Sequence, residues 1–204
     1  MVEILNNKFP VVIRTLSYSI QNINFYYPAV YIPNNSYIQG LINFTIYENM
    51  LRLSKNLMVP DIPTYVTGSY ELKNNQKGVL TLSLIGFAEF GGAHPMTMVK
   101  SLNFDLSTGK DIPFYELFKP NSPYIEVLSG MVLEELKKQD IMLFEDYPGV
   151  RPDQDYYIAD KALVIYFQLY DIAPYVVGFP YAVIPIYSII DLVQEGGLLD
   201  KMVS

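Results

Sequence analysis

Apolar residues follow two different periods along this chain, and this pattern restricts the fold more than any other feature. Between residues 65 and 106 apolar and polar residues alternate in three stretches separated by short turns, which predicts three consecutive antiparallel strands. Apolar residues recur at helical spacing in residues 38–57 and 125–136, which predicts two amphipathic helices. We therefore expect an α+β fold, with antiparallel sheets of hairpins and two main amphipathic helices packed on them.

Local signals indicate where the elements begin and end. Ser36 and Gln39 have the spacing of a capping box, and Ser122 followed by Pro123 has the pattern of an N-cap with a first-turn proline. Tyr27-Pro28 is expected to interrupt the strands of the N-terminal region. Further strands are expected in residues 11–32, 156–159, 162–167 and 183–187, and a short terminal helix in residues 189–193.

Two regions are expected, packed together as one compact unit. Residues 1–64 form a strand-helix region, and residues 65–204 form the C-terminal region. Half of the residues are hydrophobic, which is enough to bury a substantial core. No stretch approaches the roughly 18 apolar residues of a membrane helix, and the first residues lack the pattern of a leader. The protein is therefore expected to be cytosolic or to have lost its leader.

The formal charge of −7 at pH 7 limits the classes of partner. Negative charge repels nucleic-acid phosphates, and no Lys/Arg cluster offsets it locally, so no nucleic-acid partner is expected. Two interpretations stay open. The charge favours a cationic protein partner, or it keeps the protein soluble.

The residues needed for common catalytic centres are missing, so the chain is not expected to be an enzyme. There is no cysteine, and His94 is the only histidine, which excludes a multi-histidine metal site. A Ser-His-Asp triad would have to use His94 within a glycine-rich turn. Glu134 and Glu135 lie on the outward part of a predicted helix, and Asp153 and Asp155 lie in a polar connection. We expect no catalytic residue, no cofactor and no metal.

One loop, residues 170–181, is the best candidate for a binding site. It combines tyrosines and a phenylalanine with residues that restrict the backbone, and stiff aromatic loops bind with a small loss of entropy. The alternative is a loop that packs down and covers the sheet. The predicted partner-binding residues are Tyr170, Pro174, Tyr175, Gly178, Phe179 and Tyr181.

The C-terminal region contains several short motifs in a definite order and spacing. They are Gly91-Gly92-Ala93-His94, Asn103-Phe104-Asp105-Leu106, Thr108-Gly109-Lys110, Glu116-Leu117-Phe118, Leu163-Val164-Ile165-Tyr166-Phe167, Tyr170-Asp171-Ile172-Ala173-Pro174-Tyr175 and Gly178. Together these motifs resemble the RsiV-type extracellular domain, a family of domains of unknown function. The resemblance covers roughly residues 65–193, and the region before it is more loosely similar to the companion region of the same proteins.

The resemblance implies a bacterial extracytoplasmic domain, secreted or part of a membrane-anchored protein. In the RsiV family it is the lysozyme-sensing outer part of an anti-sigma factor, which implies a basic lysozyme-like muramidase as the partner. The domain also precedes the catalytic domain in PdaC-like peptidoglycan deacetylases, which implies a cell-wall glycan-binding accessory module as the alternative. The 204 residues show no sigma-binding segment, no transmembrane helix and no deacetylase histidines. We therefore expect a fragment, or a family member that does not signal in this way.

Overall fold

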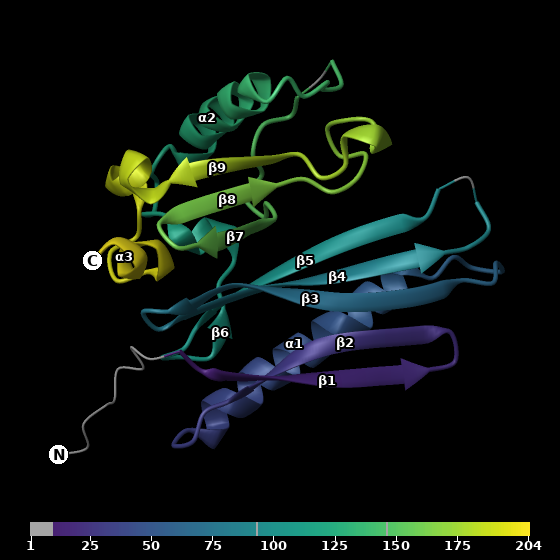
Figure 1. Cartoon of the computed structure of the whole chain (residues 1–204). Helices are drawn as coiled ribbons and strands as arrows, with labels where there is room; N and C mark the ends of the chain where they lie inside the picture. Colours follow the sequence, from purple (N-terminus) through teal and green to yellow (C-terminus); the bar gives the residue numbers. More distant parts are fainter. Residues whose placement is uncertain (1–9, 93, 146) are drawn as a thin grey trace. The chain divides into compact units, whose positions relative to one another are not determined.

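The computed structural model describes residues 10–92, 94–145 and 147–204, and it confirms the α+β class (Figure 1). The chain forms two compact units, Met1–Asp111 and Ile112–Ser204, which we call the N-terminal unit and the C-terminal unit. The structure places this boundary well after the predicted one between residues 64 and 65. The reason is that the strand beginning at Tyr65 joins the sheet formed by the strands before it.

The N-terminal unit contains one six-stranded sheet whose strands lie in chain order (Figure 1). Neighbouring strands are antiparallel except for one pair, β2 and β3, which is parallel because a helix connects them. The sheet is therefore mixed, whereas the sequence predicted antiparallel pairing alone. The elements are β1 (Val12–Ile20), β2 (Ile23–Tyr31), α1 (Ser36–Leu57), β3 (Tyr65–Gln76), β4 (Val79–Glu89), β5 (Met96–Asp105) and β6 (Lys110–Asp111).

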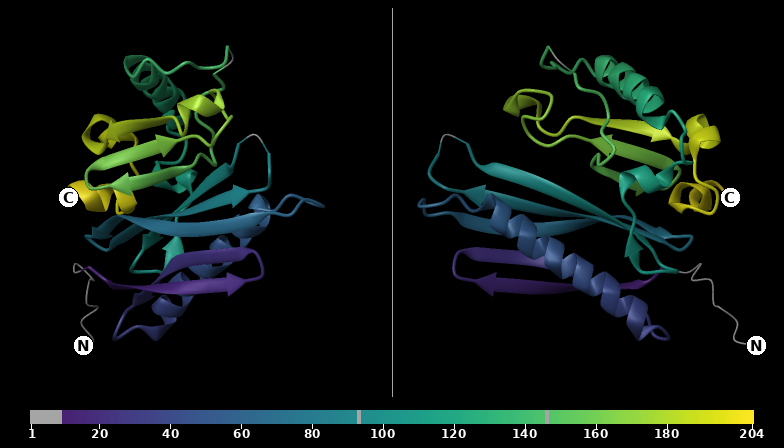
Figure 2. Two further views of the ribbon diagram at one scale, coloured as in Figure 1. Left: turned by 45° about the vertical axis from the view of Figure 1, so that its right-hand side comes forward. Right: turned by 180° about the vertical axis from the view of Figure 1, so that it is seen from behind.

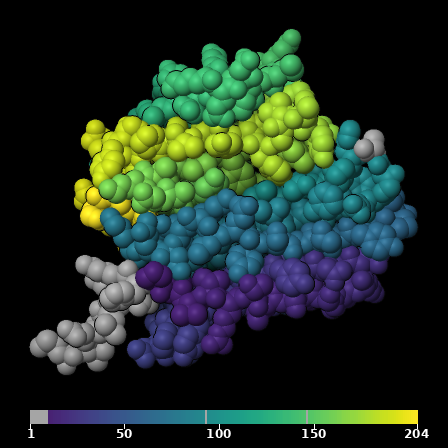
Figure 3. Space-filling view, viewed as in Figure 1, coloured from purple at the N-terminus to yellow at the C-terminus, as the bar shows by residue number. Residues whose placement is uncertain are grey.

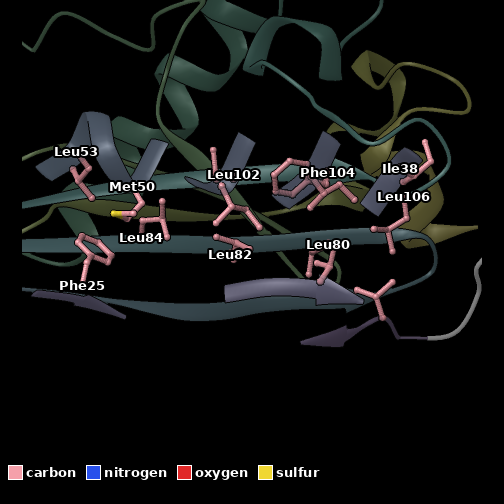
Figure 4. Packing of buried hydrophobic residues seen from close by; sticks show 14 of the residues in the cluster. Phe25, Ile38, Met50, Leu53, Leu80, Leu82, Leu84, Leu102, Phe104 and Leu106 are labelled. Atoms are coloured by element: carbon pink, nitrogen blue, oxygen red, sulfur yellow. The ribbon is translucent and has the colours of Figure 1, made fainter. Parts of the chain in front are cut away.

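The core of this unit lies between α1 and one face of the sheet (Figures 2 and 4). The helix contributes to this core the apolar side chains that recur at helical spacing in the sequence. Strands β4 and β5 contribute every second side chain, because successive side chains of a strand point to opposite faces of the sheet. Burial of these side chains is the main stabilising contribution to the unit. The buried side chains include Ile38, Ile42, Ile46, Met50, Leu53 and Leu57 of α1, with Leu80, Leu82, Leu84, Leu102 and Phe104 of the sheet.

Two asparagine side chains complete the sheet where β2 separates from β3. The two strands pair only as far as Phe25 and Gly68. Beyond that point the Asn43 side chain of α1 bonds both the N–H (2.7 Å) and the carbonyl (3.0 Å) of Val30. The Asn75 side chain does the same for Val11, at 2.9 and 2.8 Å. An amide carries both a donor and an acceptor, so each side chain replaces one residue of a missing strand.

Three predictions about element ends were wrong. Asn35, not Ser36, is the N-cap of α1, since its side chain accepts a hydrogen bond from the N–H of Ile38 at 3.0 Å. Ser122 does not cap the second helix, because its hydroxyl donates to the carbonyl of Lys119 instead. Pro28 does not end a strand but continues β2.

The C-terminal unit consists of a three-stranded antiparallel sheet in the order β7-β8-β9, with α2 packed against β9. The predicted hairpin and second helix are confirmed, and the predicted terminal helix is a 3-10 helix. The elements are η1 (Phe114–Leu117), α2 (Tyr124–Lys138), β7 (Tyr156–Ala159), β8 (Ala162–Tyr166), η2 (Tyr175–Val177), β9 (Tyr181–Pro185), η3 (Ile186–Leu192) and α3 (Leu198–Val203). Among the described residues, no helix is both long and apolar enough to span a membrane.

Candidate functional site

Residues 170–181, which we call the aromatic loop, connect β8 to β9 and contain η2 (Figure 1). Buried Ile172 and Ala173 fix the loop to the core of the C-terminal unit. The N–H of Phe167 closes its base by donating to the carbonyl of Pro180 at 2.9 Å. Gly178 has a φ of +79°, a conformation that glycine adopts without strain. The loop is therefore a folded element with a defined shape.

The predicted site residues differ in exposure. Tyr170 and Tyr181 are exposed, whereas the other four, which include Tyr175, are partly buried. The rings of Tyr170 and Tyr175 pack together, with centroids 5.7 Å apart and an interplanar angle of 34°. Among the exposed large hydrophobic residues of the loop, Val176 has the highest exposure, 89%, and the sequence prediction did not include it. The loop thus neither covers the sheet completely nor projects all of its aromatic residues.

Tyr170 has a strained backbone, with a φ of +69°. A bulky residue rarely adopts this left-handed conformation, which costs on the order of 1 kcal/mol. The backbone N–H of Asp171 donates to the carbonyl of Gln168, and the N–H of Gln168 donates to the Asp171 carboxylate, at 3.1 and 3.0 Å. These two bonds hold the turn that places the Tyr170 ring on the surface.

The segment that follows α2 runs beside the aromatic loop (Figures 1 and 2). The N–H of Phe144 donates to the carbonyl of Ile172 at 2.9 Å, and the Gln139 side chain donates to the carbonyl of Tyr181 at 3.0 Å. The segment adds two exposed apolar side chains that composition alone did not single out, because they lie in an acidic stretch. We define the aromatic patch as Met142, Phe144, Tyr170, Val176 and Tyr181, all of them exposed. Atoms of the aromatic loop are visible on the surface in Figure 3.

Negative charge is concentrated in the C-terminal unit. It contains 14 of the 21 acidic residues but only six of the 14 basic ones, a formal charge of −8, which leaves +1 on the N-terminal unit. The two segments that form the patch and its surroundings, residues 139–155 and 168–181, contain six acidic residues and one basic residue, Arg151. The aromatic patch therefore lies within the most acidic part of the chain.

One tyrosine of the segment that follows α2, Tyr147, has an unsatisfied hydroxyl. The ring of Tyr147 packs edge-on against Phe167, and burial raises the pKa of Tyr147 to about 12. Its buried hydroxyl has no hydrogen-bond partner among the described residues. A buried unpaired polar group destabilises the folded state.

We expect Tyr147→Phe to increase the free energy of unfolding by about 1 kcal/mol, because it removes that hydroxyl and keeps the ring. Urea denaturation followed by circular dichroism at pH 7 measures the change. The matched control is Tyr156→Phe, which removes a hydroxyl that donates to the carbonyl of Ile112 at 2.6 Å and should cost about 1 kcal/mol. A loss of stability in Tyr147→Phe would contradict this assignment.

The residues that the sequence offered as catalytic or metal-binding candidates do not lie together in one site. His94 is exposed in the connection between β4 and β5 of the N-terminal unit, and Glu134 and Glu135 lie on the outer part of α2. In the part of the chain that the structure describes, no group of three or more His, Cys, Asp or Glu side chains could hold a metal ion. The aromatic patch with its acidic surroundings is the candidate site.

Comparison with solved structures first shows which fold the chain shares. Two solved structures of DUF3298 family proteins share the fold over nearly the whole chain. One, from Bacteroides fragilis, has a TM-score of 0.69 and 13% identity, and covers 94% of this chain and 97% of that one. The other, from Pseudomonas aeruginosa, has a TM-score of 0.60 and 15% identity, with coverages of 92% and 96%.

Sequence comparison then shows which residues of the chain match a family model and two curated proteins. Residues 115–187 match the family model described as a protein of unknown function, DUF3298, and these residues include the aromatic loop. Esterase Rv3036c of Mycobacterium tuberculosis is 32% identical over 103 residues, which are 48% of this chain and 45% of that protein. The peptidoglycan-N-acetylmuramic acid deacetylase PdaC of Bacillus subtilis is 25% identical over 111 residues, 51% of this chain and 24% of that protein. The chain thus spans less than half the length of these curated relatives.

Proposed function

We propose that the C-terminal unit is a non-catalytic recognition module that binds a basic protein through the aromatic patch. The observation that carries this proposal is that exposed apolar side chains lie within the unit whose charge is −8. Acidic surroundings attract a cationic partner and raise the rate of encounter, while aromatic side chains supply most of the binding energy after contact. Anchored by Ile172 and Ala173, the loop is ordered before binding, which lowers the entropy cost.

The favoured partner is a lysozyme-like muramidase in an extracytoplasmic compartment. Lysozymes of this kind are cationic, which complements the acidic unit. The relative named a peptidoglycan deacetylase also acts, by its name, on the bacterial cell wall, where a muramidase would be met. The RsiV-type resemblance of the loop motifs points to the same partner.

Titration calorimetry of the whole chain with hen lysozyme tests this proposal. We expect binding that weakens as salt increases from low to moderate concentration, because salt screens exposed charges. Tyr170→Asn should weaken binding by about tenfold, since it removes an exposed ring and asparagine tolerates the left-handed backbone at this position. Tyr115→Asn is the matched control. It removes a tyrosine of similar exposure, 53% against 50%, from η1 and should change the affinity less than about twofold.

Three outcomes would contradict the proposal or a part of it. Absence of binding at both salt concentrations would remove lysozyme as the partner. Equal effects of Tyr170→Asn and Tyr115→Asn would remove the aromatic loop as the contact. In addition, hydrolysis of simple esters that is abolished by His94→Ala would contradict the non-catalytic part of the proposal.

The second candidate function is a cell-wall glycan-binding module, and the relationship to a peptidoglycan deacetylase favours it. Exposed tyrosines can stack against sugar rings, and the charge would then be incidental. Sedimentation of the chain with purified peptidoglycan separates the two functions. Glycan binding through stacking should change little with salt, whereas binding to a basic protein should weaken.

A further inference from the structure

Arg151 is the only basic residue in residues 139–155 and 168–181, the two segments that form the aromatic patch and its surroundings. Its guanidinium lies between two carboxylates, with Nε 3.6 Å from Asp153 Oδ1 and one terminal nitrogen 4.0 Å from Asp171 Oδ2. Asp171 directly follows the exposed Tyr170 in the chain. One intramolecular cation thus occupies the acidic surroundings of the patch.

The contacts of Arg151 are loose. Strong hydrogen-bonded pairs between guanidinium and carboxylate have nitrogen-oxygen distances of about 2.7–2.9 Å, and both distances here are much longer. The Arg151 side chain is 44% exposed and that of Asp153 is 86% exposed, so water screens the attraction. Pairs of this kind contribute little to stability and separate readily. The backbone position of Arg151 is held independently, because its N–H donates to the Gln154 side chain.

We propose that Arg151 is a tethered competitor for the cationic side chain of the partner. It occupies the place between Asp153 and Asp171 that an arginine or lysine of a basic protein would take, and binding displaces it into solvent. This inference rests on the proposed function and adds a specificity-determining residue to it. Because the two pairs are weak, Arg151 lowers the affinity of every cationic partner only modestly, and a partner with several positive charges loses the smallest share of its binding free energy. Arg151 therefore selects for a high density of positive charge.

Arg151→Gln tests the competition directly. The substitution removes the internal cation and keeps the backbone N–H that Gln154 accepts, so the fold is retained. We expect the affinity for hen lysozyme at low salt to increase about threefold to tenfold, because Asp153 and Asp171 become available to the partner. The gain should disappear at high salt, where exposed charges are screened.

Two control variants separate competition from overall charge. Lys138→Gln makes the same change in net charge, but Lys138 pairs with Glu135 on α2 at 3.3 Å, so its removal should change the affinity less than about twofold. Arg151→Lys retains the cation and should bind like the wild type.

The outcomes distinguish this inference from the proposed function. If the wild type binds lysozyme and Arg151→Gln binds equally or more weakly, the competition is overturned while recognition stands. Equal gains in Arg151→Gln and Lys138→Gln would assign the effect to net charge and would also overturn it. If neither the wild type nor Arg151→Gln binds lysozyme at low salt, the proposed function itself fails.

Discussion

Gly68→Ala is expected to destabilise the N-terminal unit by about 2 kcal/mol or more. A β-carbon at this position would overlap the ring of Phe25, which packs directly over Gly68 at the last paired position of β2 and β3. Phe25 is almost completely buried, so its ring cannot move aside cheaply. The gain from a less flexible unfolded chain, about 0.4–1 kcal/mol, is too small to offset this overlap. Urea denaturation followed by far-UV circular dichroism measures the change.

Gly40→Ala is the matched control for this substitution. Gly40 is an exposed residue of α1, and a β-carbon there would meet no atom within 4 Å. We expect it to stabilise the chain by about 0.5–1 kcal/mol, since alanine favours a helix interior over glycine. A double variant with Phe25→Leu should lose less stability than the two single losses added together, because Phe25→Leu makes room for the new methyl group. Strictly additive losses would contradict the contact between Phe25 and Gly68.

Asp111→Asn is expected to stabilise the chain by about 2–3 kcal/mol at pH 7.5. Burial raises the pKa of Asp111 from 3.8 to about 6, although the N–H of Asn103 and the charge of Lys100 act in the opposite direction. The raised pKa means that the stabilising contribution of Asp111 is complete below pH 3.8 and is lost as the pH rises through 6. Asparagine carries no charge at any pH and keeps an oxygen that can accept the N–H of Asn103, which lies 2.7 Å from the carboxylate.

The difference in free energy of unfolding between Asp111→Asn and the wild type, measured from pH 3.5 to 7.5, checks this expectation. It should be close to zero at the acid end, increase through pH 5 and level off above pH 6. Asp61→Asn is the control, because it removes an aspartate from an exposed position of the same unit. A pH-independent difference for Asp111→Asn would show that its carboxyl is not the group responsible.

Local patterns in the sequence predicted most of the elements correctly. The apolar stripe of residues 38–57 indicated which side of α1 is buried, since helical period and burial have the same geometric cause. The parallel pairing of β2 with β3 could not be predicted in this way, because it depends on where α1 returns the chain. The bonds between Asn75 and Val11 join residues 64 positions apart, and no local pattern marks them.

Composition indicated which loop is the candidate site, but it did not indicate which side chains of that site are exposed. The stiffness and aromatic content of residues 170–181 indicated the loop. Which side chains face solvent is decided by the folded loop, in which Ile172 and Ala173 are buried, Tyr175 packs against the exposed ring of Tyr170, and Val176 stays exposed. Met142 and Phe144 join the patch through hydrogen bonds between distant segments, so their place in it became visible only in the folded chain.

The hydrogen bonds between Asn75 and Val11 have a mechanical consequence. A pulling force applied ahead of β1 and directed along that strand would load the β1–β2 ladder in shear, so that its bonds would have to break together and not one after another. Asn75 adds two further bonds at the residue where the force would enter, and it transfers part of the load to β3. The first strand should therefore resist tension as part of the whole sheet, and would be peeled away only by a force across it.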